Sequence, residues 1–209
     1  MEAKVYNSKG EFAGRKVTLP NEVFGIEPND HAIYLDVKLF LANQRQGTHK
    51  SKDKSEVAYS TRKLKRQKGT GGARAGSRKS GTIVGGGRIH GPRPRNYGFK
   101  LNSKLKNLAR ISALSYKAKE DKVMVIEDLS FDKPSTHAFS HLLKNMNIEG
   151  TKTLFLVHNS DNNTILSGRN IPNNKIAQAN SLNTYEIVNS HNLILTEAAI
   201  NIINDTYKK

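Results

Sequence analysis

The sequence contains no cysteine among its 209 residues. Without thiols the chain has no disulfides, no thiolate zinc or iron–sulfur sites and no cysteine nucleophile. It also lacks any run of about 18 apolar residues, and its first residues show no basic segment followed by an apolar one. We therefore expect an intracellular chain that is neither exported by a signal peptide nor embedded in a membrane.

Acidic residues are missing from one long stretch. Between Val57 and Lys119 there is no Asp or Glu, whereas the same stretch contains 17 Lys and Arg. Residues 45–106 hold 18 Lys and Arg against 2 acids, a net charge of +16, and the rest of the chain holds 16 of each sign. A basic segment without its own counter-ions needs an anionic partner, which is typical of polyanion binders.

Glycine gathers in the same segment, with ten of the sixteen glycines between Gly69 and Gly98. Apolar residues are few there, so the segment cannot bury enough surface to fold unaided. The alternative, a flexible linker, is disfavoured because the two flanks resemble parts of one fold and because Pro92 and Pro94 stiffen the chain. The sequence predicts a long extended basic loop, residues 47–100, that becomes ordered against its partner and is disordered when free.

The flanks predict a three-layer α/β fold, with a mainly parallel sheet covered by helices and formed by residues 1–46 and 101–209 as a single domain. Strands that are apolar on both faces and alternate with helices are typical of this class. The expected strands are residues 4–6, 17–19, 123–126, 153–157, 185–188 and 193–195. The expected helices are a mostly buried one from about 30 to 46, one over 102–120, one capped by Ser135 or Thr136, a short one around 164–169 and a last one from Thr196.

Catalytic and cofactor motifs are not recognisable. The glycine clusters have the wrong spacing for a dinucleotide site, and one imitates a phosphate loop without its lysine. His137 and His141 have the i, i+4 spacing of metal ligands, but without a third ligand surface histidines are the better interpretation. Glu127, Asp128 and Asp132 follow a strand with no nucleophile nearby, which favours capping. We expect no enzyme, no cofactor and no metal.

A series of motifs marks residues 62–118: RQKGTG at 66–71, AR-x-GS at 73–77, GGG at 85–87, GP-x-PR-x-Y at 91–97 and SALS at 112–115. With these motifs the chain resembles the bacterial family of large-subunit ribosomal protein L-four, tightly in the loop and more loosely after residue 150. The resemblance implies a structural constituent of the large subunit in the cytoplasmic ribosome. Its implied partners are large-subunit ribosomal RNA, bound early in assembly, neighbouring large-subunit proteins and the nascent polypeptide in the exit tunnel.

The chain departs from the family pattern at several places. It has Lys65 and Gly72 where relatives often have Trp and Arg, and Ile83 with Val84 in place of a Trp-Arg pair. Stacking of these positions on bases is therefore not expected. The stretch between residues 188 and 193 is also shorter than usual, so we expect the last crossover helix to be lost or reduced to a turn.

The site residues follow from these arguments. Basic side chains expected to pair with phosphates are Arg62, Lys63, Lys65, Arg66, Lys68, Arg74, Arg78, Lys79, Arg88, Arg93, Arg95, Lys100, Lys104 and Lys106. Backbone is expected to approach RNA closely at Gly69, Gly71, Gly72, Gly76, Gly85, Gly86, Gly87 and Gly91. By the resemblance, the tip in the exit tunnel is Arg66, Gln67, Lys68, Gly69, Thr70 and Gly71. Phe99 is assigned to packing on the domain, and Tyr97 is left open between that and a base.

Two other classes of protein explain part of the pattern. An RNA-modifying enzyme with a Rossmann-like domain and a basic arm accounts for the fold class and the charge, but its glycine fingerprint after a strand is missing. A general nucleic-acid chaperone accounts for the charge alone. It does not account for the fixed order of the glycine and proline motifs in the loop.

Overall fold

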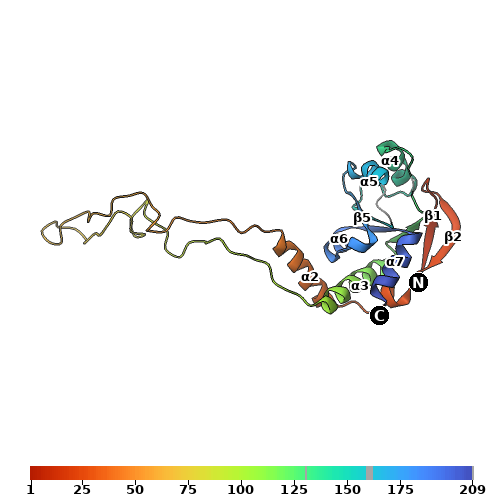
Figure 1. Ribbon diagram of the computed structural model, residues 1–209, viewed down its shortest axis with the longest axis horizontal. Helices are drawn as coiled ribbons and strands as arrows, with labels where there is room; N and C mark the ends of the chain where they lie inside the picture. The colour runs from red at the N-terminus through yellow and green to blue at the C-terminus, as the bar shows by residue number, and fades with distance from the viewer. Residues whose placement is uncertain (130, 159–161, 209) are drawn as a thin grey trace. The chain divides into compact units, whose positions relative to one another are not determined.

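The computed structural model describes residues 1–129, 131–158 and 162–208, which form two compact units (Figure 1). The first unit, called here the α/β unit, combines both ends of the chain, Met1–Leu41 and Lys100–Lys209. The second, called here the basic arm, is Ala42–Phe99. Each unit is described by itself.

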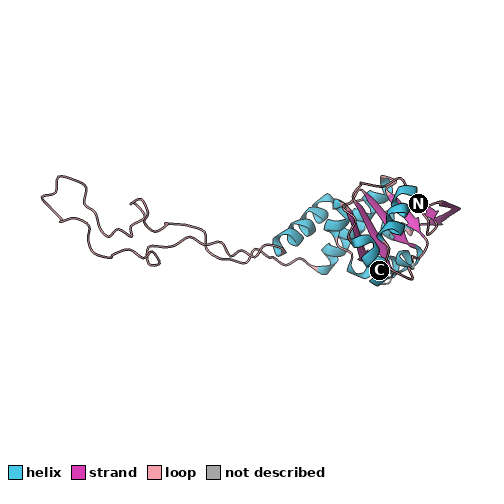
Figure 2. Ribbon diagram, turned by 90° about the horizontal axis from the view of Figure 1, so that it is seen from above, coloured by secondary structure: helices cyan, strands magenta, loops and turns pink. Residues whose placement is uncertain are grey.

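The α/β unit is built on a six-stranded sheet with the strand order β2-β1-β3-β6-β4-β5. Its strands are β1 (Glu2–Tyr6), β2 (Phe12–Thr18), β3 (Val123–Ile126), β4 (Thr153–Val157), β5 (Asn174–Gln178) and β6 (Asn192–Thr196). β1 and β2 pair antiparallel, and every other neighbouring pair is parallel. Helices lie on both sides of the sheet (Figure 2). The predicted three-layer α/β fold with a mainly parallel sheet is confirmed.

Seven α-helices and one 3₁₀ helix are found in the described part of the chain. They are α1 (Asn21–Phe24), α2 (Asp30–Asn43), α3 (Ser103–Lys119), α4 (Thr136–Asn145), α5 (Asn162–Arg169), η1 (Ala179–Ser181), α6 (Thr184–Asn189) and α7 (Glu197–Tyr207). Two begin at hydroxyl caps: Ser135 accepts a hydrogen bond from the Ala138 amide, and Thr196 accepts one from the Ala199 amide, both at 3.3 Å. Such caps satisfy amides that have no partner inside the helix, so they define where each helix begins.

Successive side chains of the central strands point to opposite faces of the sheet and contribute to two apolar layers, one on each face. In β6, Leu193 and Leu195 join the layer under α1, α3, α6 and α7, whereas Ile194 joins the layer under α4. β4 does the same, with Phe155 on the α4 side. Successive side chains of a strand point to opposite faces, so a strand covered on both faces must be apolar throughout.

The predicted strand at 185–188 is wrong, because these residues lie in α6. Asn183 caps this helix by accepting a hydrogen bond from the Glu186 amide at 2.8 Å. The same helix connects β5 to β6, so the expectation of a lost crossover helix is also wrong. The strand that precedes it, β5, was not predicted.

The prediction of a mostly buried helix before the arm is wrong as well. Helix α2 ends at Asn43, and only Ala32 and Leu39 along it are buried. Tyr34 and Leu41 are exposed. The helix is apolar on more than one side, and residues such as Ile33, Val37 and Phe40 are only half-buried.

The basic arm consists of an outgoing and a returning segment that run side by side (Figures 1 and 2). Every residue of the arm is described, and none beyond the end of α2 lies in a helix or named strand. Backbone hydrogen bonds join the two segments: the Arg95 amide donates to the Gly47 carbonyl at 3.1 Å, and the Arg88 amide donates to the Lys52 carbonyl at 2.9 Å. The Ser51 amide also donates to the Pro92 carbonyl at 3.2 Å, so a small number of backbone bonds connects the two segments.

Candidate nucleic-acid interface

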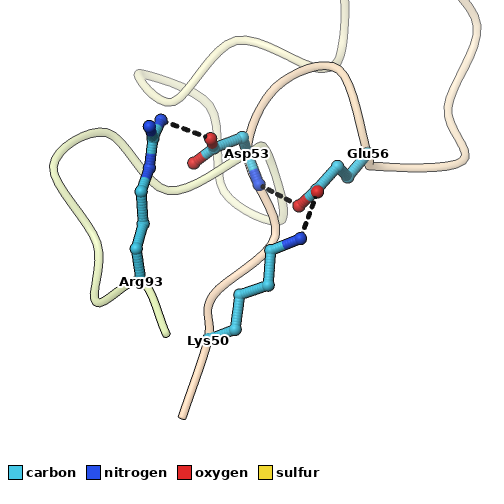
Figure 3. A network of polar contacts seen from close by, with 4 residues as sticks. All are labelled: Lys50, Asp53, Glu56 and Arg93. Atoms are coloured by element: carbon cyan, nitrogen blue, oxygen red, sulfur yellow. Dashed lines mark hydrogen bonds and ion pairs between the residues drawn. The ribbon is translucent and has the colours of Figure 1, made fainter. Parts of the chain in front are cut away.

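The only two acids of the arm both have cationic partners within it (Figure 3). Asp53 accepts a hydrogen bond from the Arg93 guanidinium at 2.7 Å, which joins the outgoing to the returning segment. Glu56 pairs with Lys50 and also accepts a hydrogen bond from the Asp53 amide at 3.2 Å. The hydrogen bond from Lys50, followed by that from the Asp53 amide, lowers the pKa of Glu56. Lys50 and Arg93 are thus neutralised within the arm.

The other thirteen cations of the arm form no ion pair with any residue that the structure describes. They are Arg45, Lys52, Lys54, Arg62, Lys63, Lys65, Arg66, Lys68, Arg74, Arg78, Lys79, Arg88 and Arg95. All except the half-buried Lys79 are exposed. Positive charge without local neutralisation creates a strong potential, which attracts a polyanion.

Three of these cations were missed by the residue-level prediction: Arg45, Lys52 and Lys54. They belong to the outgoing segment before the motif-rich part of the loop. The charge count over residues 45–106 included them, so composition carried the signal although no motif did. Conversely, the predicted phosphate ligand Arg93 is the one whose guanidinium already has a carboxylate partner.

The tip of the arm is a closed hairpin-like turn. Lys63 and Ser77 form an isolated antiparallel bridge, and the Leu64 amide donates to the Gly76 carbonyl at 3.0 Å. All residues from 66 to 71 are exposed. Gly69 and Gly71 have φ of +77° and +65°, a backbone conformation that glycine adopts without strain. The chain thus turns back between them.

The predicted glycines divide into two groups. A Cβ built on the tip glycines Gly69 and Gly71, or on Gly76 beside the tip, meets no protein atom within 4 Å, so their backbone is open to a partner. By contrast, a Cβ on Gly86 would lie 1.8 Å from the Ser80 carbonyl oxygen. In the second group, glycine is therefore required by the protein itself, because a side chain would not fit where two backbone segments are in close contact.

Further glycines complete this division. A Cβ on Gly91 would lie 1.8 Å from the Ser51 hydroxyl, and Gly87 is buried against the Lys54 backbone. Gly85 has a φ of +82°, and Gly72 has only the end of a lysine side chain as its nearest neighbour. Gly86, Gly87 and Gly91 thus hold the arm together, whereas Gly72 keeps open surroundings like those of the tip.

Tyr97 is engaged within the arm. The guanidinium carbons of Arg45 and Arg95 lie 3.7 Å and 4.5 Å from its ring centre, as cation–π contacts. Its hydroxyl lies 3.1 Å from Nε2 of His49, and Gly47 packs beside the ring. These contacts hold the ring against other residues of the arm. Phe99, at the end of the arm, keeps 39% of its surface exposed.

The α/β unit adds three of the predicted basic residues: Lys100 and Lys104 are exposed, and Lys106 is half-buried. Two other cations of α3 have structural contacts. Arg110 donates to the Tyr207 hydroxyl at 3.5 Å, and Lys117 donates to the Ser190 carbonyl at 2.7 Å. Burial lowers the pKa of Lys117.

The carboxyl edge of the sheet, where ligands of such folds bind, holds a compact ion-pair cluster. Arg15 contacts Glu127 after β3 at 2.9 Å and Glu197 after β6 at 3.0 Å. In the described part of the chain no group of three or more His, Asp or Glu is arranged to hold a metal. Over the same residues, no helix is long and apolar enough to span a membrane. The fold and the arm together define an α/β protein with a long cationic arm.

Comparison with known sequences identifies the family. The profile of the "Ribosomal protein L4/L1 family" matches residues 17–206. The "Large ribosomal subunit protein uL4" of Porphyromonas gingivalis is 54% identical over 208 residues, which cover 100% of both chains. That of Cytophaga hutchinsonii is 51% identical over 97% of this chain and 98% of its own, and that of Flavobacterium johnsoniae is 51% identical over 100% of both.

The chain therefore belongs to the ribosomal protein L4/L1 family. It is a ribosomal protein and not an enzyme. The family membership that the loop motifs predicted is confirmed.

Proposed function

We propose that this chain is a structural component of the large ribosomal subunit in the cytoplasm, and that its basic arm binds the RNA of that subunit. The relatives that match its whole length are large-subunit proteins. One observation carries the proposal for RNA: thirteen arm cations have no acidic partner among the described residues, while the arm's two acids are paired with Lys50 and Arg93. The phosphates of ribosomal RNA supply the missing negative charge.

The arm binds through two kinds of contact. Exposed lysines and arginines of the arm pair with phosphates, and Lys100 and Lys104 of the α/β unit do the same. Arginine and lysine contacts of this kind position a protein on RNA without reading sequence. The open glycines Gly69, Gly71 and Gly76 allow the backbone itself to approach the RNA, because nothing in the protein fills the space beside them.

The tip, residues 66–71, is the part that lines the nascent-polypeptide exit tunnel in this proposal. Support comes from the RQKGTG motif, from the exposure of all six residues and from the turn at Gly69 and Gly71. Lys65 stands where relatives often have Trp, so the approach to the tip is cationic rather than aromatic in this chain. Residues 1–46 and 101–209 are then the domain that contacts neighbouring proteins, and residues 47–100 the loop that binds RNA early in assembly.

Salt-dependent binding tests the RNA part of the proposal. Full-length chain and a variant with residues 48–98 replaced by a short Gly-Ser turn are titrated with a large-subunit RNA fragment at several salt concentrations. Each contact between a basic side chain and a phosphate contributes about 0.7–0.9 to the slope of log K against log salt. We expect a steep slope for the full chain and near-complete loss of binding for the variant, whose unfolding in urea stays cooperative. Salt-insensitive binding, or full affinity of the variant, contradicts the proposal.

Site-specific cross-linking tests the position of the tip. A photoreactive side chain is placed at Gln67, and at the exposed Ala13 of β2 as the control, in ribosomes that carry a stalled, labelled nascent chain. Cross-linking of the nascent chain from position 67 and not from position 13 is the expected result. Equal labelling of both positions, or of neither, contradicts the tunnel assignment.

A further inference from the structure

Two histidines of the α/β unit have no part in the proposed RNA interface. His137 and His141 are exposed, one turn apart on α4. Their Nε2 atoms lie 3.3 Å apart, and the ring planes meet at 70° with centroids 4.4 Å apart. The opposite side of α4 is buried against the sheet through Phe139, Leu142 and Leu143. The pair therefore faces solvent from a helix that is fixed by its core side.

The distance between the two nitrogens matches that of two ligands on one metal ion. Imidazole nitrogens bind zinc at about 2.0–2.1 Å, and two ligands at a tetrahedral angle are then about 3.3–3.4 Å apart. We propose that His137 and His141 form a two-imidazole site for a divalent transition-metal cation, with water completing the coordination. The two nitrogens keep their separation on binding, and the rings turn so that both lone pairs point at the metal.

The ligand chemistry selects the class of metal. Neutral imidazole suits zinc, copper and nickel, whereas magnesium and calcium prefer oxygen ligands. Among the described residues, no third His, Asp or Glu joins the pair. A site with two protein ligands exchanges its metal with solution and does not hold the fold together. This distinguishes it from the structural zinc sites that the sequence excludes, which use four protein ligands.

The proton balance of binding is simple. The two Nε2 atoms lie 3.3 Å apart, and which ring carries its hydrogen on Nε2 depends on the tautomer. A metal needs the lone pairs of both nitrogens, so each ring must keep its hydrogen on Nδ1. When both rings are neutral, a hydrogen on Nε2 moves to Nδ1 and two metal–nitrogen bonds form without net proton release.

Calorimetric titration of the untagged, RNA-free full chain with copper(II) or zinc(II) tests the site. One metal per chain is expected, bound more tightly for copper than for zinc, following the usual order of stability. His137→Ala and His141→Ala should each weaken binding by about tenfold or more. Because both positions are exposed, far-UV circular dichroism should not change. His191→Ala, which removes an exposed histidine elsewhere, should bind like the unmodified chain.

A spacing variant separates this site from general histidine content. In Ala138→His/His141→Ala the number of histidines is unchanged, but adjacent residues on a helix do not face each other. This variant should lose the site as completely as His137→Ala, and the copper complex should lose the paramagnetic resonance signature of two bound nitrogens. Unchanged affinity in the spacing variant, or in His137→Ala/His141→Ala, overturns the proposal.

Discussion

The Asp53 carboxylate accepts a hydrogen bond from the Arg93 guanidinium at 2.7 Å, across a separation of 40 residues in the sequence. This ion pair connects the outgoing and returning segments of the arm. It also removes Arg93 from the set of free cations. The pair therefore has two opposing effects on RNA binding. It orders the arm, and it reduces the positive charge that the arm offers to RNA.

Neutralising this carboxylate should increase the salt dependence of RNA binding. In Asp53→Asn the amide oxygen still accepts a hydrogen bond, but Arg93 is free to contact a phosphate. We expect the slope of log K against log salt to steepen by about 0.7–0.9, measured by filter binding with a large-subunit RNA fragment.

Arg88→Ala is the matched control, because Arg88 has no acidic partner among the described residues. Its slope should become shallower by about the same amount. A slope that becomes shallower in both variants would show that the Asp53–Arg93 pair is needed for RNA binding as it stands.

The two groups of glycines should respond differently to alanine. In Gly86→Ala the new methyl group would lie 1.8 Å from the Ser80 carbonyl oxygen, so the backbone of the ordered arm must move. In the complex with RNA, amide exchange should then accelerate at Gly87, whose amide donates to the Lys79 carbonyl at 3.0 Å. Hydrogen exchange of the RNA complex, read from amide spectra, checks this.

Gly76→Ala is the counterpart beside the tip, where a Cβ meets no protein atom within 4 Å. The spectrum of the free chain should stay the same outside the neighbourhood of the substitution. RNA binding should nevertheless weaken several-fold, because the methyl group occupies space assigned to RNA. Unchanged RNA affinity would remove Gly76 from the set of close-approach positions.

The core beneath α4 should depend strongly on Phe155. This residue is 1% exposed, and its ring meets that of Phe139 edge-on with centroids 5.0 Å apart. We expect Phe155→Ala to lower the free energy of unfolding by about 3–5 kcal/mol in urea denaturation, since it leaves a cavity in a packed layer. Val84→Ala on the arm, at 97% exposure, should change it by less than about 0.5 kcal/mol.

The raised pKa of Tyr116 predicts that the folded protein loses stability at high pH. Its phenol donates a hydrogen bond to the Asp30 carboxylate at 2.6 Å, and this bond, with burial and the Asp30 charge, raises the pKa of Tyr116. Above about pH 10 the unfolded chain releases this proton before the folded chain does. The folded state then binds more protons, so stability falls as pH rises through the folded pKa.

Carbon-13 spectra of the tyrosine ring carbons across pH 9–12 measure the effect. The Tyr116 signal should titrate at higher pH than in Asp30→Asn, where the acceptor has no charge. In Tyr116→Phe, stability should fall less steeply over the same range. Identical titration of Tyr116 in both chains would show that the Asp30 contact does not control its ionisation.

The run of apolar residues in a short segment was enough to predict a strand where the segment is completely buried. β3 and β4 were predicted at their observed bounds because VMVI and TLFLV are apolar at every position and covered on both faces. The 185–188 error came from reading Tyr185, Ile187 and Val188 as a strand. Asn183 followed by Glu186 was the capping signal that indicated a helix there.

β5 was missed for the opposite reason. Its residues, NKIAQ, include only two apolar side chains, because this edge strand is half-buried. Pairing with β4 over Thr153–Val157, rather than its own composition, makes it a strand. An edge strand obtains its hydrogen bonds from one neighbour, so the decisive information lies in another part of the sequence.

The site shows the same division. Charge count, glycine content and the RQKGTG motif were enough to identify the arm and the family, because these features belong to single residues and short runs. Which cations stay free, which glycines hold the arm together and which partners Tyr97 has were decided only by tertiary contacts. Asp53 meets Arg93, and Gly91 meets Ser51, 40 residues apart in each case. Such pairs form only when the chain turns back on itself, and their short-range interactions depend on the distances that folding sets.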